Sequence, residues 1–154
     1  MTTLRVALRT VGCRANQADT AWLARALDPS LVEVVDFDDD AEIYVVNSCA
    51  VTREAERDVR RLVARARRRP SARILLTGCM VGACAEAVAA LEPLWRVVPS
   101  WERDRIPSML HGFAGEAPAV DALHAVPAPL RRARPNLRVQ DGCERRCAYC
   151  AVPA

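Results

Sequence analysis

The first hundred residues alternate between short apolar segments and longer amphipathic segments. This alternation constrains the fold more than any other feature of the sequence. Five segments have the length and composition of buried strands: residues 5–10, 31–35, 43–46, 74–76 and 96–98. Three segments have helical spacing of apolar residues: 16–27, 52–69 and 83–91. This order predicts an α/β fold, a Rossmann-like parallel sheet with helices on both faces. Strands that are apolar throughout are expected when both faces are covered.

Local signals place the ends of the predicted helices. Thr52 is a suitable N-cap, and Glu54 and Glu56 follow in the first turn, where they complement the helix dipole. Pro70 should stop the same helix at about residue 69. The Asp-Pro-Ser sequence at 28–30 should end the preceding helix.

The composition changes after residue 111. Glycine and proline become frequent over residues 112–135 and the apolar periodicity fades, which is typical of a linker. Residues 137–140 then read as the first strand of another unit. We expect a domain at 1–111, a linker at 112–135 and the start of a truncated second domain at 136–154. The second domain has too few residues to fold, so we expect the chain to be a fragment.

Bulk composition excludes several classes of protein. Hydrophobic residues make up 51% of the 154 residues and charged residues 27%, as in soluble globular proteins. No signal peptide is visible, and no apolar run approaches the roughly 18 residues of a membrane span. We therefore expect a cytoplasmic protein without a membrane partner. Thiols stay reduced there, so seven cysteines indicate metal or redox chemistry rather than disulfides.

Three of the cysteines lie within eight residues near the end of the chain, as Cys143, Cys147 and Cys150. Three thiolates can hold three irons of a four-iron cluster, which leaves one iron open to bind a cofactor. A structural zinc site would require four protein ligands, and no fourth Cys or His is near in sequence. A zinc knuckle or unligated cysteines are the alternatives to a cluster.

Three other cysteines each follow a predicted strand directly: Cys13, Cys49 and Cys79. They are separated by 36 and 30 residues, but the carboxyl ends of parallel strands share one edge of a sheet. Gly12 and Gly78 would let the backbone approach a bound group closely. We therefore expect one shared site, with buried structural cysteines as the alternative.

Other polar residues have weaker functional signals. Cys84 falls in a predicted helix and is interpreted as a packed thiol. Arginines between 57 and 69 could contact nucleic-acid phosphates, although such a run is more often a solvated helix face. His111 and His124 have no partner pattern and are expected at the surface.

The cysteine motifs together resemble a known family, the radical S-adenosylmethionine methylthiotransferases, in their N-terminal part. The matching segments are 12–17 (GCRANQ), 46–52 (VNSCAVT), 77–80 (TGCM) and 140–153 (QDGCERRCAYCAVP). The resemblance covers essentially the whole chain and includes every cysteine except Cys84. The segment around Cys49 is most similar to the branch that acts on threonylcarbamoyladenosine in tRNA.

The resemblance implies an auxiliary-cluster domain followed by the first strand of a truncated TIM-type radical-SAM barrel. Cys143, Cys147 and Cys150 would hold a 4Fe–4S cluster that binds S-adenosylmethionine, with Tyr149 near the adenine. The auxiliary 4Fe–4S cluster, which supplies or carries the inserted sulfur, would be held by the three strand-end cysteines Cys13, Cys49 and Cys79. Asn16 and Asn47 are candidates for shaping that site, and a helix N-cap is the alternative role for Asn16.

The implied reaction adds a methylthio group to C2 of a modified adenosine next to the tRNA anticodon. Relatives acting on isopentenyladenosine or on a ribosomal-protein aspartate are the alternatives, as are an iron–sulfur electron carrier and a cluster-free interaction domain. tRNA would bind mainly through the family's C-terminal part. Flavodoxin or ferredoxin would supply electrons. The protein is expected to be a monomer. We expect the fragment alone to be inactive. Between the first two cysteines of the triplet, the family is expected to have neutral polar and aromatic residues. This chain instead has Glu-Arg-Arg at 144–146.

Overall fold

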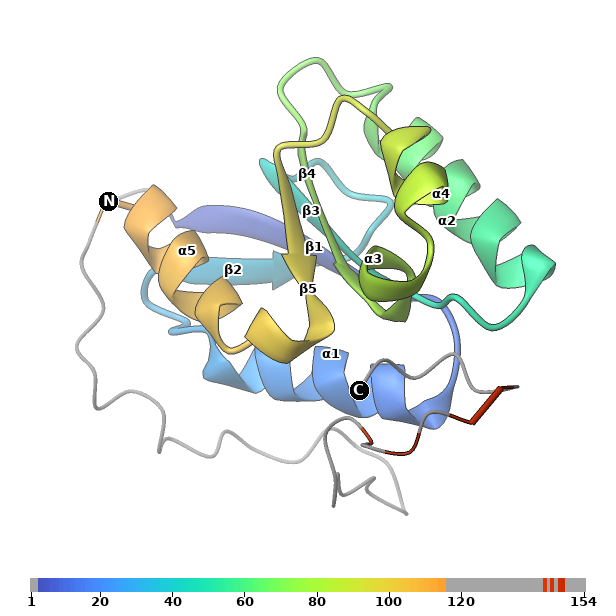
Figure 1. Cartoon of the computed structure of the whole chain (residues 1–154). Helices are drawn as coiled ribbons and strands as arrows, with labels where there is room; N and C mark the ends of the chain where they lie inside the picture. The colour runs from blue at the N-terminus through green and yellow to red at the C-terminus, as the bar shows by residue number, and fades with distance from the viewer. Residues whose placement is uncertain (1–2, 116–142, 144, 146, 149–154) are drawn as a thin grey trace.

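The computed structural model describes residues 3–115, 143, 145, 147 and 148 (Figure 1). The strands are β1 (Leu4–Thr10), β2 (Val32–Val35), β3 (Ile43–Ser48), β4 (Arg73–Gly78) and β5 (Arg96–Pro99). The α-helices are α1 (Arg14–Ala26), α2 (Arg53–Ala66), α3 (Cys79–Ala83), α4 (Ala85–Ala89) and α5 (Arg105–Phe113), and a 3₁₀ turn, η1, covers Ser100–Glu102.

All five strands are parallel and lie in the order β2-β1-β3-β4-β5. The chain runs outward from β1 to β2 and then returns to place β3 on the other side of β1. The order therefore reverses between β1 and β3, and this reversal is the topological switch point of a doubly wound sheet. The predicted parallel α/β architecture is confirmed.

Side chains on the two faces of the sheet form two separate cores. On one face, Tyr44 and Val46 of β3 pack with Val59 and Val63 of α2. On the other face, β3 contributes Ile43 and Val45, which pack with residues of α1 and α5. Every side chain of β3 is buried, which agrees with the apolar run predicted at 43–46, and the strand continues through Asn47 and Ser48. Figure 1 shows the helices divided between the two sides of the sheet.

The start of α2 follows the predicted capping pattern. The hydroxyl of Thr52 accepts a hydrogen bond from the N–H of Ala55 at 3.1 Å, and Glu54 and Glu56 occupy the first turn. The helix ends at Ala66 rather than at residue 69. Residues 67–69 instead form turns whose N–H groups bond the last helical carbonyls.

The segment after β4 differs from its prediction. A single helix was expected over 83–91, but α3 and α4 are two five-residue helices. They are separated by Cys84, whose backbone at φ −137° and ψ 63° cannot continue a helix. The carbonyl of Met80 accepts the N–H of Cys84 and so closes the first of them.

The expectation for His111 is wrong. Its side chain is 3% exposed, and Nε2 accepts a hydrogen bond from the backbone N–H of Asp28 at 3.1 Å. His111 therefore joins α5 to the turn that follows α1, where an imidazole nitrogen replaces a missing backbone acceptor.

Several predictions fall outside the described residues: most of the linker, the strand at 137–140, His124, Tyr149 and Cys150. Within the described residues, no helix combines the length and apolar character needed to cross a bilayer.

Candidate three-thiol site at the carboxyl edge of the sheet

Three cysteines follow the carboxyl ends of the three central strands. Cys13 comes after β1, Cys49 after β3, and Cys79 directly after β4 as the first residue of α3. These strands are neighbours in the sheet, so all three cysteines lie at one edge. Cys13 and Cys49 are on either side of the switch point, where open α/β sheets bind ligands.

Contacts with Asn16 and Gly12 bring these cysteines together. The amide oxygen Oδ1 of Asn16 lies 3.8 Å from the Sγ of Cys13 and 3.7 Å from the Sγ of Cys79. A Cβ placed on Gly12 would lie 2.5 Å from the Cβ of Cys49 and 3.0 Å from its Sγ. Three thiols from three distant segments therefore surround one small region.

Two glycines allow the loops to come this close. Gly12 has φ +118° and Gly78 has φ +98°, a region that side-chain-bearing residues rarely adopt. A Cβ on Gly78 would lie 2.3 Å from the carbonyl oxygen of Ser48, which is backbone and cannot yield. Each glycine precedes a cysteine, so the conformation that permits close packing also directs the following thiol.

Asn16 lies at the centre of the site and is 2% exposed. Its Nδ2 donates to the carbonyl of Val11 at 3.1 Å and to the carbonyl of Ser48 at 2.9 Å. It thus joins the loop of Cys13 to the loop of Cys49 while its oxygen faces two thiols. The alternative role as a helix N-cap is wrong, because Cys13 occupies that position without a side-chain capping bond.

A second row of polar residues supports Asn16. The amide of Asn47 donates to the carbonyl of Asn16 at 2.9 Å and to the hydroxyl of Thr20 at 3.1 Å. The hydroxyl of Thr10 donates to that of Thr20 at 2.7 Å. Sequence reasoning had named Asn47 but missed both threonines. The only available signal was their position, since Thr20 is one helical turn after Asn16.

The surroundings of Cys79 disfavour ionisation of its thiol. Burial raises the pKa of the Cys79 thiol, and the nearby Cys49 and Cys13 sulfurs raise it further. Cys49 is buried and its sulfur accepts the N–H of Val51 at 3.5 Å. A bound metal centre would change this balance, because a coordinating thiol loses its proton outright.

The chemistry of the donor set fits an iron–sulfur group, because Cys thiolates are the usual ligands of such clusters. Among the described residues, no group of three Cys, His, Asp or Glu side chains is arranged to hold a metal ion. Ligation itself stays a prediction.

The other cysteines are placed less fully. Cys143 is half-buried and Cys147 is exposed, whereas Cys150 and Tyr149 lie outside the described residues. The cluster predicted at this triplet therefore stays a prediction. Cys84, at the break between α3 and α4, packs partly buried against the core of the α2 face, as expected of a packed thiol.

Comparison with known proteins agrees with this arrangement. The family described as "Uncharacterized protein family UPF0004" matches residues 5–99, which span the sheet from β1 to β5 and include all three strand-end cysteines. The chain belongs to the UPF0004 family. Named proteins that are similar to this chain can therefore be compared with it.

Three kinds of named methylthiotransferase are similar to this UPF0004 chain. It is 32% identical to threonylcarbamoyladenosine tRNA methylthiotransferase MtaB of Aquifex aeolicus, over 97% of this chain and 40% of the relative. It is 29% identical to tRNA-2-methylthio-N(6)-dimethylallyladenosine synthase of Paracoccus denitrificans, over 95% of this chain and 35% of the relative. It is 32% identical to ribosomal protein uS12 methylthiotransferase RimO of Roseiflexus, over 94% of this chain and 37% of the relative.

The predicted resemblance to methylthiotransferases is confirmed by these similarities. The chain spans 35–40% of the length of these three relatives.

Proposed function

We propose that the chain is the cluster-binding, N-terminal part of a cytoplasmic tRNA methylthiotransferase. Its substrate would be N6-threonylcarbamoyladenosine next to the anticodon, which would receive a methylthio group at C2. The convergence of Cys13, Cys49 and Cys79 at the switch point is the observation that carries the proposal. The choice of substrate follows four relatives that bear this activity in their names, at 27–32% identity.

The six cysteines would divide between two 4Fe–4S clusters. Cys13, Cys49 and Cys79 would hold the auxiliary cluster, and Cys143, Cys147 and Cys150 would hold the one that binds S-adenosylmethionine. When bound, these groups would supply one-electron reduction, C–H activation and the inserted sulfur. Flavodoxin or ferredoxin is the proposed source of electrons.

The chain's own residues prepare the auxiliary site. Gly12 and Gly78 let the loops that carry the thiols approach closely, and Asn16 fixes the loops of Cys13 and Cys49. Cys13 is the N-cap of the 13-residue helix α1, so the start of this helix fixes the position of the first thiol. These contacts set the three thiols in place before any ligand binds.

Anaerobic reconstitution with ferrous iron and sulfide tests the proposal directly. The chain should take up about eight irons, as two four-iron clusters. Alanine at Cys13, Cys49 and Cys79 together should remove half of this iron, whereas Cys143→Ala should remove the other half. Cys84→Ala is the matched control, since it deletes a partly buried thiol nearby. Full iron in the triple variant would refute the auxiliary site.

The substrate requires a separate test with the whole gene. Deleting it in its host should abolish the 2-methylthio derivative of threonylcarbamoyladenosine in digested tRNA, and the unthiolated nucleoside should accumulate. Mass spectrometry resolves both. Loss of the dimethylallyladenosine derivative, or of the methylthio group on ribosomal protein uS12, would assign the chain to another branch.

A further inference from the structure

The arginines of α2 and of the turn after it separate into two groups. Those toward the C-terminal end of the segment are already engaged. Arg60 pairs with Glu56 at 2.7 Å, and Arg61 pairs with Asp58 at 3.2 Å. Three more arginines bond acids or carbonyls of neighbouring loops: Arg65 with Asp38, Arg67 with the carbonyl of Leu91, and Arg69 with Asp40. Arg68, which is exposed, is the exception at this end, so the free positive charge here is smaller than the number of arginines indicates.

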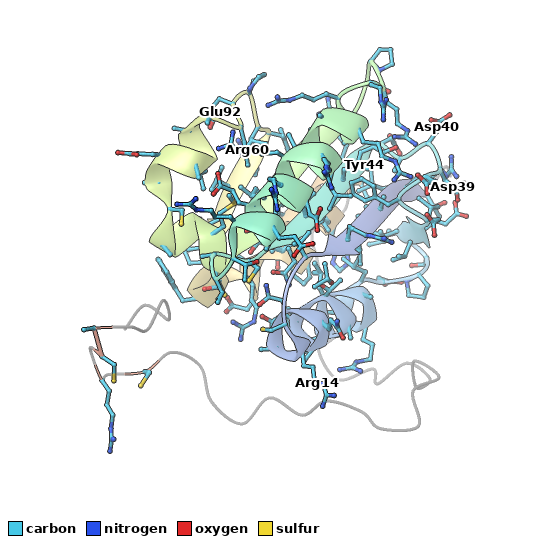
Figure 2. All side chains as sticks on the ribbon, turned by 90° about the vertical axis from the view of Figure 1, so that its right-hand side faces the viewer. Arg14, Asp39, Asp40, Tyr44, Arg60 and Glu92 are labelled. Carbon is cyan, nitrogen blue, oxygen red and sulfur yellow. The ribbon has the colours of Figure 1, made fainter. Side chains whose placement is uncertain are left out.

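The arginines next to the thiols differ from this group because their side chains are exposed and unpaired among the described residues. Arg53 and Arg57 are exposed in the first half of α2, one turn apart, and have no ionic or hydrogen-bonding partner among the described residues. Arg14 directly follows Cys13 and is likewise exposed without such a partner in the described part. Figure 2 shows Arg14 projecting from α1 away from the rest of the domain.

Topology places these three arginines around the thiol site. Helices α1 and α2 cover opposite faces of the sheet, and both begin at the edge that carries the thiols. Arg14 therefore flanks the edge from one layer, and Arg53 with Arg57 flanks it from the other. Glu54, exposed beside Arg53, is an acid in the same turn.

We propose that Arg14, Arg53 and Arg57 form an arginine rim that binds the phosphate backbone of RNA across the thiol edge. The inference rests on the proposed tRNA substrate and adds which surface of this domain holds it. Exposed, unpaired guanidinium groups match phosphate oxygens in charge and in fork geometry. A polyanion can reach both layers at once, and so can engage all three arginines.

Trp101 favours RNA over other polyanions. It lies in η1, directly after β5, and therefore at the same edge of the sheet, and it is 60% exposed. An exposed indole ring stacks on unpaired bases, which an anticodon loop provides. The edge thus combines phosphate-binding cations with an aromatic surface for a base.

A binding assay tests the arginine rim. The full chain is titrated into a fluorescein-labelled anticodon stem-loop RNA, and fluorescence anisotropy measures the affinity at several salt concentrations. Three phosphate contacts should make the affinity fall about 20- to 40-fold between about 50 and 200 mM salt. The triple variant Arg14→Gln, Arg53→Gln, Arg57→Gln should lose this part of the salt dependence. Trp101→Ala should weaken binding while leaving the salt dependence unchanged, because stacking releases no counterions.

Two further variants serve as controls. Arg68→Gln removes an equally exposed charge at the far end of the same segment and should leave binding unchanged. Glu54→Gln should strengthen binding. Equal losses from Arg68→Gln and from the rim variants would overturn the proposal, as would the absence of binding at low salt. Iron content, measured on each variant, separates failure of the rim from failure of the cluster site.

Discussion

Gly78→Ala is the substitution for which the structure predicts the largest cost from a single added methyl group. Gly78 ends β4 at φ +98° and ψ −172°, a conformation that only glycine adopts readily. Its added Cβ would lie 2.3 Å from the carbonyl oxygen and 2.6 Å from the nitrogen of Ser48. Ser48 pairs with Gly78 across β3 and β4, so relief requires these central strands to separate.

Two terms give the magnitude. Holding a residue with a Cβ in this region costs about 1–3 kcal/mol. Displacing tightly packed backbone costs a similar amount, about 1–3 kcal/mol by analogy with overpacked cores. The free energy of unfolding should therefore fall by about 2–6 kcal/mol, which is a large part of the 5–15 kcal/mol typical of a domain.

Urea unfolding followed by far-ultraviolet circular dichroism, under reducing conditions, measures this change. Gly112→Ala is the matched control, because Gly112 lies inside α5 with nothing within 4 Å of its added Cβ. That substitution should stabilise the chain by about 0.5–1 kcal/mol through helix propensity. If Gly78→Ala unfolded at the same urea concentration as the parent chain, the steric reasoning would be wrong.

Three further outcomes follow from individual side chains. Asn16→Asp should lower the unfolding free energy by at least about 2 kcal/mol and reduce bound iron, because a carboxylate would face two backbone carbonyls; urea titration and iron assay measure both. His111→Leu should cost about 1–3 kcal/mol in the same titration, since the N–H of Asp28 loses its acceptor. The pKa of Asp28 is lowered from the usual value for aspartate because the hydroxyl and N–H of Ser30 donate to its carboxylate. The stability that this contributes is present above the unfolded-state pKa and is lost as pH falls through the lowered pKa. An NMR titration should show this, and Ser30→Ala should raise the midpoint.

The convergence of the strand-end cysteines could be predicted from sequence because it depends only on topology. Once alternation indicates parallel strands, every residue that follows a strand must lie at the same edge. Cys13, Cys49 and Cys79 could therefore be placed at one edge, but the strand order that makes them neighbours came from the structure. The cap at Thr52 was predictable for a similar reason, since its partner lies three residues away.

Contacts that depend on the third dimension could not be predicted this way. Asn16 satisfies carbonyls on two loops, one of them 32 residues distant, and nothing in its local sequence indicates either. His111 was assigned to the surface because no partner pattern surrounds it in sequence, and its partner is 83 residues away. The engagement of Arg65 and Arg69 could not be predicted until the acidic loop at 38–40 was placed beside them.

The cysteines follow β1, β3 and β4, each of which has a hydrogen-bonded neighbour on both sides, whereas β2 and β5 form the two margins of the sheet. Marginal strands open first when a sheet fluctuates, and they are where insertions and substitutions do least harm. A cysteine on either margin would move with that opening, and a bound group would be exposed to oxygen each time. Placing the thiols after interior strands therefore ties the lifetime of the site to global rather than local unfolding.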